Sequence, residues 1–144
     1  MSYIRRWGAH MWQGTNRRYR RSERMCEAAS YQLDTCLAEH GIEEISVVDE
    51  RGLVVARAGD DTSSSEVLGA HAPLLFRTVD PQSRRRIFSS MVADVGRDRL
   101  RRASVREFVV QGQPLFLCLV GGRAREKNLA IRRAVNGITR ILCA

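Results

Sequence analysis

The sequence predicts an α/β (α+β) domain in which an antiparallel sheet is covered on both faces. Two pairs of β-rich runs are each joined by a short segment with a glycine, which is typical of β-hairpins. The run Leu115–Val120 is almost wholly apolar, and strands of this kind are buried on both faces of a sheet. Helices above and below the sheet, or a partner subunit on one side, must therefore cover it. The expected order is helix, strand, strand, helix, an optional further helix, strand, strand, helix.

The composition fits one domain with a short extension. The chain has 144 residues, of which 44% are apolar, so it can bury a real core. Its formal net charge is +8, but residues 1–24 carry seven arginines and one glutamate, leaving only +2 for the rest. The basic character belongs mainly to the N-terminal segment, and a nucleic-acid-binding domain is therefore less strongly indicated than a basic arm.

Residues 1–21 are expected to form a basic, disordered extension, and residues 22–144 the folded domain. Glycines interrupt any periodic pattern in the extension, and aromatic residues alternate with arginine pairs. Either the segment is a passive or wrongly included extension, or it binds an acidic protein, a nucleic acid or a membrane surface. The candidate contacts are Arg17, Arg18, Arg20 and Arg21.

The first half of the domain is expected to be a helix followed by a hairpin and a second helix. Apolar residues at helical spacing follow Ser22, and Gly41 is placed to end that helix. The strands 45–48 and 53–56 follow, with Gly52 supplying the positive φ of the turn. Ser63 and Glu66 fit a capping box for the middle helix. Pro73 predicts a kink or a break near residues 69–73.

The second half is expected to contain a helix, a second hairpin and a final helix. Asp80 and the proline after it mark a helix start, because aspartate is a good N-cap and proline suits the first helical position. Strands are expected over 101–111 and 113–120, and a helix over 126–142. Gly137 within that helix indicates close packing. The run Arg84, Arg85 and Arg86 is expected on the solvent side of its helix, as a solvated face or a docking patch.

No catalytic, cofactor-binding or metal-binding residues can be assigned. The three histidines are scattered, and no Cys–His or Ser–His pair is indicated. The loop Gly121-Gly122-Arg123 lacks the pattern of a nucleotide-binding loop. Four cysteines form no C-x-x-C pair, and reduced, mostly buried thiols in a cytoplasmic protein are expected. No apolar run approaches the length of a transmembrane segment.

The run Ile45 to Ala56, with its two apolar strands and its acidic turn with glycine, resembles the Roadblock / dynein light chain family. The strand Leu115 to Val120 and the helix after it resemble the same family, so the resemblance spans about residues 25–144. It implies a central antiparallel sheet with two helices on one face and the middle helix on the other. It also implies no catalysis, homodimerisation through the middle helix and an edge strand, and regulation of a Ras-like GTPase or a scaffolding role.

On this interpretation the dimer or partner surface lies on the middle helix and the strand Ser104–Val110. The candidate residues are Leu68, His71, Ala72, Leu75, Phe76, Val79, Arg106 and Phe108. The segment Asp80–Arg102 departs from the family pattern and is expected to replace an edge strand. The alternative is a protein that binds nucleic acid or another anionic surface through its N-terminus and the Arg84–Arg102 region. A ligand-sensing domain is a third, less supported possibility.

Overall fold

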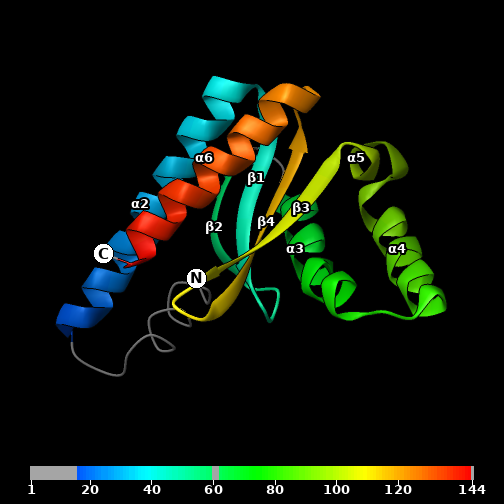
Figure 1. Cartoon of the computed structure of the whole chain (residues 1–144), viewed down its shortest axis with the longest axis horizontal. Helices are drawn as coiled ribbons and strands as arrows, with labels where there is room; N and C mark the ends of the chain where they lie inside the picture. The colour runs from blue at the N-terminus through cyan, green and yellow to red at the C-terminus, as the bar shows by residue number, and fades with distance from the viewer. Residues whose placement is uncertain (1–15, 60–61, 144) are drawn as a thin grey trace.

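The computed structural model of the protein describes residues 16–59 and 62–143, with side chains described for residues 23–59 and 66–143. Helices and strands follow each other in the predicted order, with one extra short helix before the third strand (Figure 1). The elements are α2 (Asn16–His40), β1 (Ile42–Asp49), β2 (Val54–Gly59), α3 (Thr62–Arg77), α4 (Pro81–Val95), α5 (Arg97–Arg101), β3 (Ala103–Val110), β4 (Gln113–Gly121) and α6 (Ala124–Cys143).

The sheet consists of the two predicted hairpins, joined through their inner strands. The strand order is β2-β1-β4-β3, and every neighbouring pair is antiparallel. β1 and β4 form the centre, where Val47 lies opposite Leu117. β3 is an edge strand paired only with β4 among the described residues. The continuous apolar run of β4 is buried from Leu115 to Val120, as the sequence predicted.

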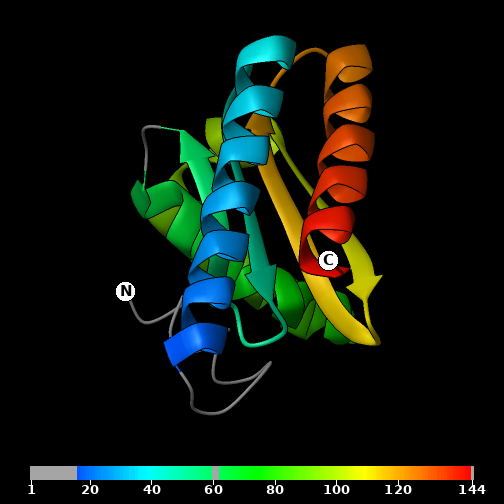
Figure 2. The same ribbon diagram turned by 90° about the vertical axis from the view of Figure 1, so that its left-hand side faces the viewer.

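Helices α2 and α6 cover one face of the sheet side by side (Figure 2). Alternate residues of the central strands point toward them, including Val47 and Leu117, and pack with Leu33 and Ile138. Gly137 allows the two helices to approach, because a Cβ at this position would lie 2.5 Å from the Gln32 Nε2 atom. The close packing predicted for Gly137 is confirmed.

Helix α3 covers the other face. Val48 and Phe116, from the two central strands, pack against Leu68 and Ala72 of α3. Helix α4 packs against α3 and adds one fully buried side chain, Met91, to this smaller core. The two-sided cover implied by the family resemblance is therefore present within one chain.

The turn between β1 and β2 also fixes α3. The Asp49 Oδ1 atom accepts hydrogen bonds from the backbone N–H groups of Arg51, at 2.9 Å, and Leu53, at 3.0 Å. Gly52 has a φ of 82°, as predicted, and a Cβ there would lie 3.0 Å from the Cα of Ala70. Only glycine fits this conformation and this approach of the helix.

Two predicted helix starts and one predicted break differ from the structure. Helix α2 begins at Asn16 rather than Ser22, because residues 16–21 contain no proline or glycine and are rich in arginine, a good helix former. Helix α3 continues through Pro73, which is buried, so the predicted break is absent and the predicted kink stays a prediction. Helix α3 begins at Thr62, so Ser63 is inside it, and the capping box stays a prediction because these side chains lie outside those described.

Candidate interaction surfaces

The residues predicted for a dimer surface do not form one surface. Leu68 and Ala72 are buried against the sheet of their own chain, and Leu75 is half-buried beside them. Phe108 of β3 points to the opposite face, where it packs against the α2 and α6 core. Arg106, which shares its strand, is exposed. Leu68 and Ala72 therefore serve the chain's own core.

His71 is a packed histidine. Its side chain is half-buried on α3, and its Nδ1 atom lies 2.8 Å from the carbonyl oxygen of Val67, one helical turn earlier. A neutral imidazole with the proton on Nδ1 donates this hydrogen bond. The contact explains the position of the ring without any catalytic function.

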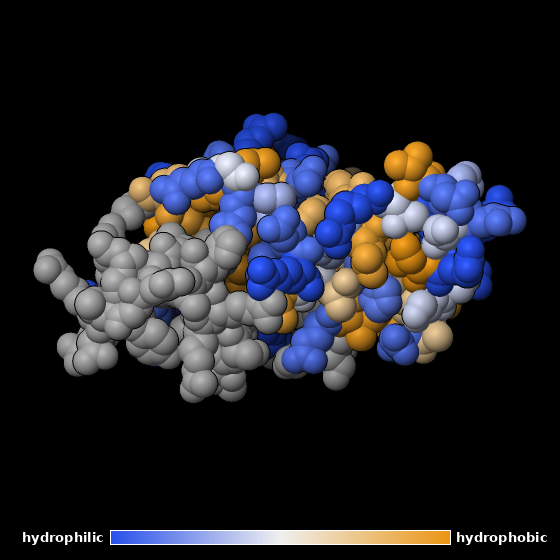
Figure 3. Space-filling model, turned by 90° about the horizontal axis from the view of Figure 1, so that it is seen from below, coloured by the Kyte–Doolittle hydropathy of each residue, from blue (hydrophilic) through white to orange (hydrophobic). Residues whose placement is uncertain are grey.

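Apolar side chains are exposed on the last turns of α3, in the connection to α4 and in the middle of α4. Val79 is 89% exposed and Phe76 is 47% exposed, although the Phe76 ring also contacts Phe116 with centroids 5.4 Å apart. Leu74 and Phe88, which the sequence analysis did not select, are exposed as well. We call Leu74, Phe76, Val79 and Phe88 the α3–α4 corner. Figure 3 shows hydrophobic side chains gathered over this end of the molecule.

The arginines of α4 divide into one structural and two free side chains. Arg84 donates hydrogen bonds to the carbonyl oxygens of Leu75 and Thr78, so it caps the C-terminal end of α3. Arg85 and Arg86 are exposed, and no carboxylate among the described residues pairs with them. The basic candidates Arg17, Arg18, Arg20 and Arg21 have side chains outside those described.

The predicted start of α4 is confirmed. The Asp80 carboxylate accepts hydrogen bonds of 2.9 Å from the backbone N–H and from the hydroxyl of Ser83. The backbone hydrogen bond is the main reason that the pKa of Asp80 lies below its ordinary value. Asp80 is therefore a structural residue that fixes where α4 begins.

Helix α5 is fixed to the sheet by charge. Glu44 of β1 is only 2% exposed, and its carboxylate pairs with the guanidinium group of Arg99. Beside it, Glu43 pairs with Arg102, whose carbonyl oxygen accepts a 3.1 Å hydrogen bond from the Lys127 Nζ atom. The sequence analysis missed this cluster, because nothing local to β1 shows which arginine will meet its glutamates.

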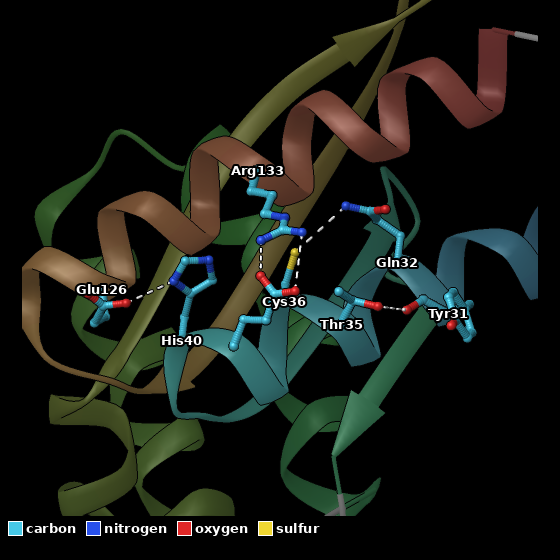
Figure 4. A network of polar contacts seen from close by, with 8 residues as sticks. Tyr31, Gln32, Thr35, Cys36, His40, Glu126 and Arg133 are labelled. Carbon is cyan, nitrogen blue, oxygen red and sulfur yellow. Dashed lines mark hydrogen bonds and ion pairs between the residues drawn. The ribbon is translucent and has the colours of Figure 1, made fainter.

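A second polar network joins the outer sides of α2 and α6 (Figure 4). The His40 Nδ1 atom lies 2.9 Å from the Glu126 Oε1 atom, and Arg133 forms an ion pair with Glu39. Beside this network lies a groove of about 790 Å³, open to solvent. The sequence gave no signal of this groove, because His40 comes from a different helix than the arginines that line it.

Three of the four cysteines are buried in the core. Cys26, Cys36 and Cys118 are buried and free, as predicted, while Cys143 is exposed. Burial raises the pKa of Cys118 to about 12 and that of Cys26 to about 11. Within residues 16–59 and 62–143, no cluster of side chains is arranged to hold a metal ion. In the same residues, no helix has the length and apolar character needed to span a bilayer.

Solved structures with the same architecture exist. A structure of Myxococcus xanthus MglB is similar over 81% of this chain and 89% of that chain, with 12% sequence identity and a TM-score of 0.53. A structure of the gliding protein MglB from Thermus thermophilus is similar over 81% and 90%, with 16% identity and a TM-score of 0.52. No protein-family model and no curated protein matches the sequence. At these identities the likeness concerns the fold, and it confirms that the chain has a Roadblock-like fold.

Proposed function

We propose that the chain is a non-enzymatic, homodimeric adaptor that regulates a Ras-like small GTPase or serves as a signalling or motility scaffold in the cytoplasm. The observation that carries the proposal is the α3–α4 corner, an exposed apolar surface on a fold shared with MglB. Contiguous apolar surface on a folded protein marks a site of protein–protein contact more often than a solvated face. The fold supports the regulatory class, and the corner supports a protein partner.

The dimer surface is best assigned to the α3–α4 corner together with the free edge of β3. Val109 of β3 is 59% exposed and alternates with Phe108, so it lies on the α3 side of the sheet. An edge strand also offers unpaired backbone groups to a second chain. Both features lie on the side of the sheet that α3 covers only partly.

The oligomeric state tests this assignment. Light scattering at micromolar concentration should show a dimer, and Val79→Asp and Phe76→Asp should each convert it to a monomer, because a buried unpaired carboxylate is unfavourable in an interface. Tyr31→Asp is the matched control, since Tyr31 is 75% exposed on α2, away from this surface. A wild-type protein that remains monomeric at this concentration would exclude homodimerisation.

The regulatory activity needs a separate assay. The GTP hydrolysis and nucleotide release of small GTPases from the same genome should be measured with and without the protein. We expect a change of at least severalfold with one of them, and no hydrolysis by the protein alone. The change should be lost with Val79→Asp and kept with Tyr31→Asp. If none of these GTPases binds or responds, the GTPase part of the proposal is wrong.

A second candidate function is binding to nucleic acid or another anionic surface. It is favoured by one observation, the exposed and unpaired guanidinium groups of Arg85 and Arg86. Binding to random DNA or RNA should then fall steeply with salt and be weakened by removal of residues 1–24 and by Arg85→Glu/Arg86→Glu. Binding that is absent at low salt would reject this function.

A further inference from the structure

The groove on the outer side of α6 is lined mostly by arginines and uncharged polar side chains, with Leu129 as its one apolar lining residue. Arg132, Asn136, Thr139 and Arg140 of α6 line it along the helix, and His40 lines it from α2. No carboxylate from the described residues lines it. A groove that presents donors without acidic side chains is complementary to a ligand with several negative charges.

Two of its arginines are not neutralised. Arg133, at the same groove, is paired with Glu39, and His40 is paired with Glu126. By contrast, Arg132 and Arg140 are exposed and pair with no carboxylate in the described part of the chain. Their guanidinium groups are therefore available for the two-pronged hydrogen bonds that arginine makes with carboxylates.

His40 adds a buried nitrogen atom without a partner. Its Nδ1 atom contacts Glu126, while its Nε2 atom is buried and has no hydrogen-bond partner among the described residues. Figure 4 shows this second nitrogen on the side of the ring that faces Arg133. Buried polar atoms are rarely left unsatisfied, so this atom, which need not carry a proton when Nδ1–H donates to Glu126, marks a place for a bound water beside the groove.

The spacing of the polar side chains along α6 favours an extended ligand. Arg132, Asn136 and Arg140 recur every four residues, which is about 6 Å along a helix axis. Side chains on one side of an extended chain recur about every 6.6 Å. Successive acidic side chains of an extended segment can therefore meet these three residues in turn. An open groove of this kind follows a polypeptide better than it encloses a small molecule.

We propose that the groove between the outer side of α6 and the end of α2 binds an extended acidic segment of a partner protein. The groove lies on the face of the sheet opposite to the α3–α4 corner. The proposal therefore goes beyond GTPase regulation: the same chain can hold one partner on its α3 side and a second, acidic partner on its α6 side. Neither the measurement of the oligomeric state nor the GTPase assay tests binding to this groove.

The test uses the full chain and a fluorescent hexaglutamate peptide, with binding followed by anisotropy. Wild-type protein should bind saturably, and more weakly as salt increases. Arg132→Glu/Arg140→Glu should reduce the affinity at least tenfold. Arg125→Glu/Arg85→Glu is the control, because it changes the net charge equally at exposed arginines outside the groove, and it should reduce the affinity less than threefold. If circular dichroism shows that the first variant is unstable, Arg132→Gln/Arg140→Gln takes its place and should also reduce the affinity for the peptide.

Three results would overturn the proposal. One is the absence of saturable binding at low salt, and another is an equal loss in both double variants, which would show that only net charge matters. The third is displacement of the peptide by inorganic pyrophosphate at comparable concentrations, which would indicate a small-anion site. In support, the His40 Nε2 resonance in a ¹⁵N-labelled sample should shift as the peptide binds, and the resonance of His71 should not.

Discussion

The two faces of the sheet are covered in different ways. Among the side chains that the structure describes, α2 and α6 enclose a core of 19 buried residues on one face. On the other face, α3 and α4 enclose seven buried residues of the described part, and the α3–α4 corner exposes apolar side chains next to them. The comparison shows that the chain completes one face by itself and leaves the other partly open. We infer that folding stability comes mainly from the first face, and that the proposed dimer contact uses the second.

The two attachments also differ in kind. Helix α6 places Ile131, Ala134 and Ile138 on one buried stripe and arginines on the other side, so apolar packing holds it along its length. Helix α4 has only Met91 fully buried. The segment that follows it, α5, is fixed through the ion pair of Arg99 with Glu44. Apolar packing therefore holds α6 on the sheet, whereas the α4–α5 segment is held by one buried side chain of α4 and by the ion pair of α5.

The largest expected effect tests the first face. Leu33→Ala, which truncates a fully buried α2 side chain, should lower the free energy of unfolding by about 3 to 5 kcal/mol in urea titrations. Leu75→Ala on α3 should lower the free energy of unfolding clearly less at low protein concentration, because Leu75 is only half-buried. Equal losses for the two variants would contradict the comparison.

The ionic attachment of α5 should give the next largest effect. Glu44→Ala leaves Arg99 without its buried partner and should lower the free energy of unfolding by about 3 kcal/mol. The reason is that a buried charge without its counter-charge is strongly unfavourable. Hydrogen exchange should accelerate in α5 and α4 more than in α2 and α6. Glu107→Ala is the control, because Glu107 is exposed on β3. A loss spread evenly over all helices would contradict a local attachment.

Both cores should respond to alkaline pH. The pKa of Cys118 is about 12 and that of Cys26 about 11 in the folded chain, against 9.0 for a free thiol. The unfolded chain therefore releases these protons first, and stability should fall as pH rises above about 9, by up to about 1.4 kcal/mol per pH unit for each thiol. Urea titrations between pH 8 and 10.5 measure this slope. Cys118→Ala should reduce it, and Cys143→Ala, which changes an exposed thiol, should not.

The smallest effect concerns the turn between β3 and β4, at the open edge of the sheet. Gln111 has a φ of 53° and precedes Gly112, whose φ is 76°. A side chain at positive φ is unfavourable by about 1 kcal/mol, so Gln111→Gly should raise the thermal midpoint by a few degrees. Gln113→Gly, in β4, should lower it instead. A lower midpoint for Gln111→Gly would show that the side chain makes a stabilising contact.

Much of the fold was predictable because its signals are local. The glycine turns, the apolar run of β4 and the Asp80 cap each lie within a few residues of the structure they specify. The interaction surfaces depend on distant pairs, and these were missed. His40 and Glu126 are 86 positions apart, so periodicity within either helix gives no sign of their contact. The predicted partner residues failed to gather because helical spacing alone did not separate Leu68, which faces the sheet, from Leu74, which faces solvent.

The buried pair of Glu44 and Arg99 has a consequence for how the molecule responds to temperature. The cost of removing charges from water continues to fall on warming, while the hydrophobic stabilisation per unit of buried area reaches a plateau. Heat should therefore loosen the rest of the chain before it loosens the anchorage of α5. On cooling, that cost rises again, so the same pair contributes less to holding α5 in place.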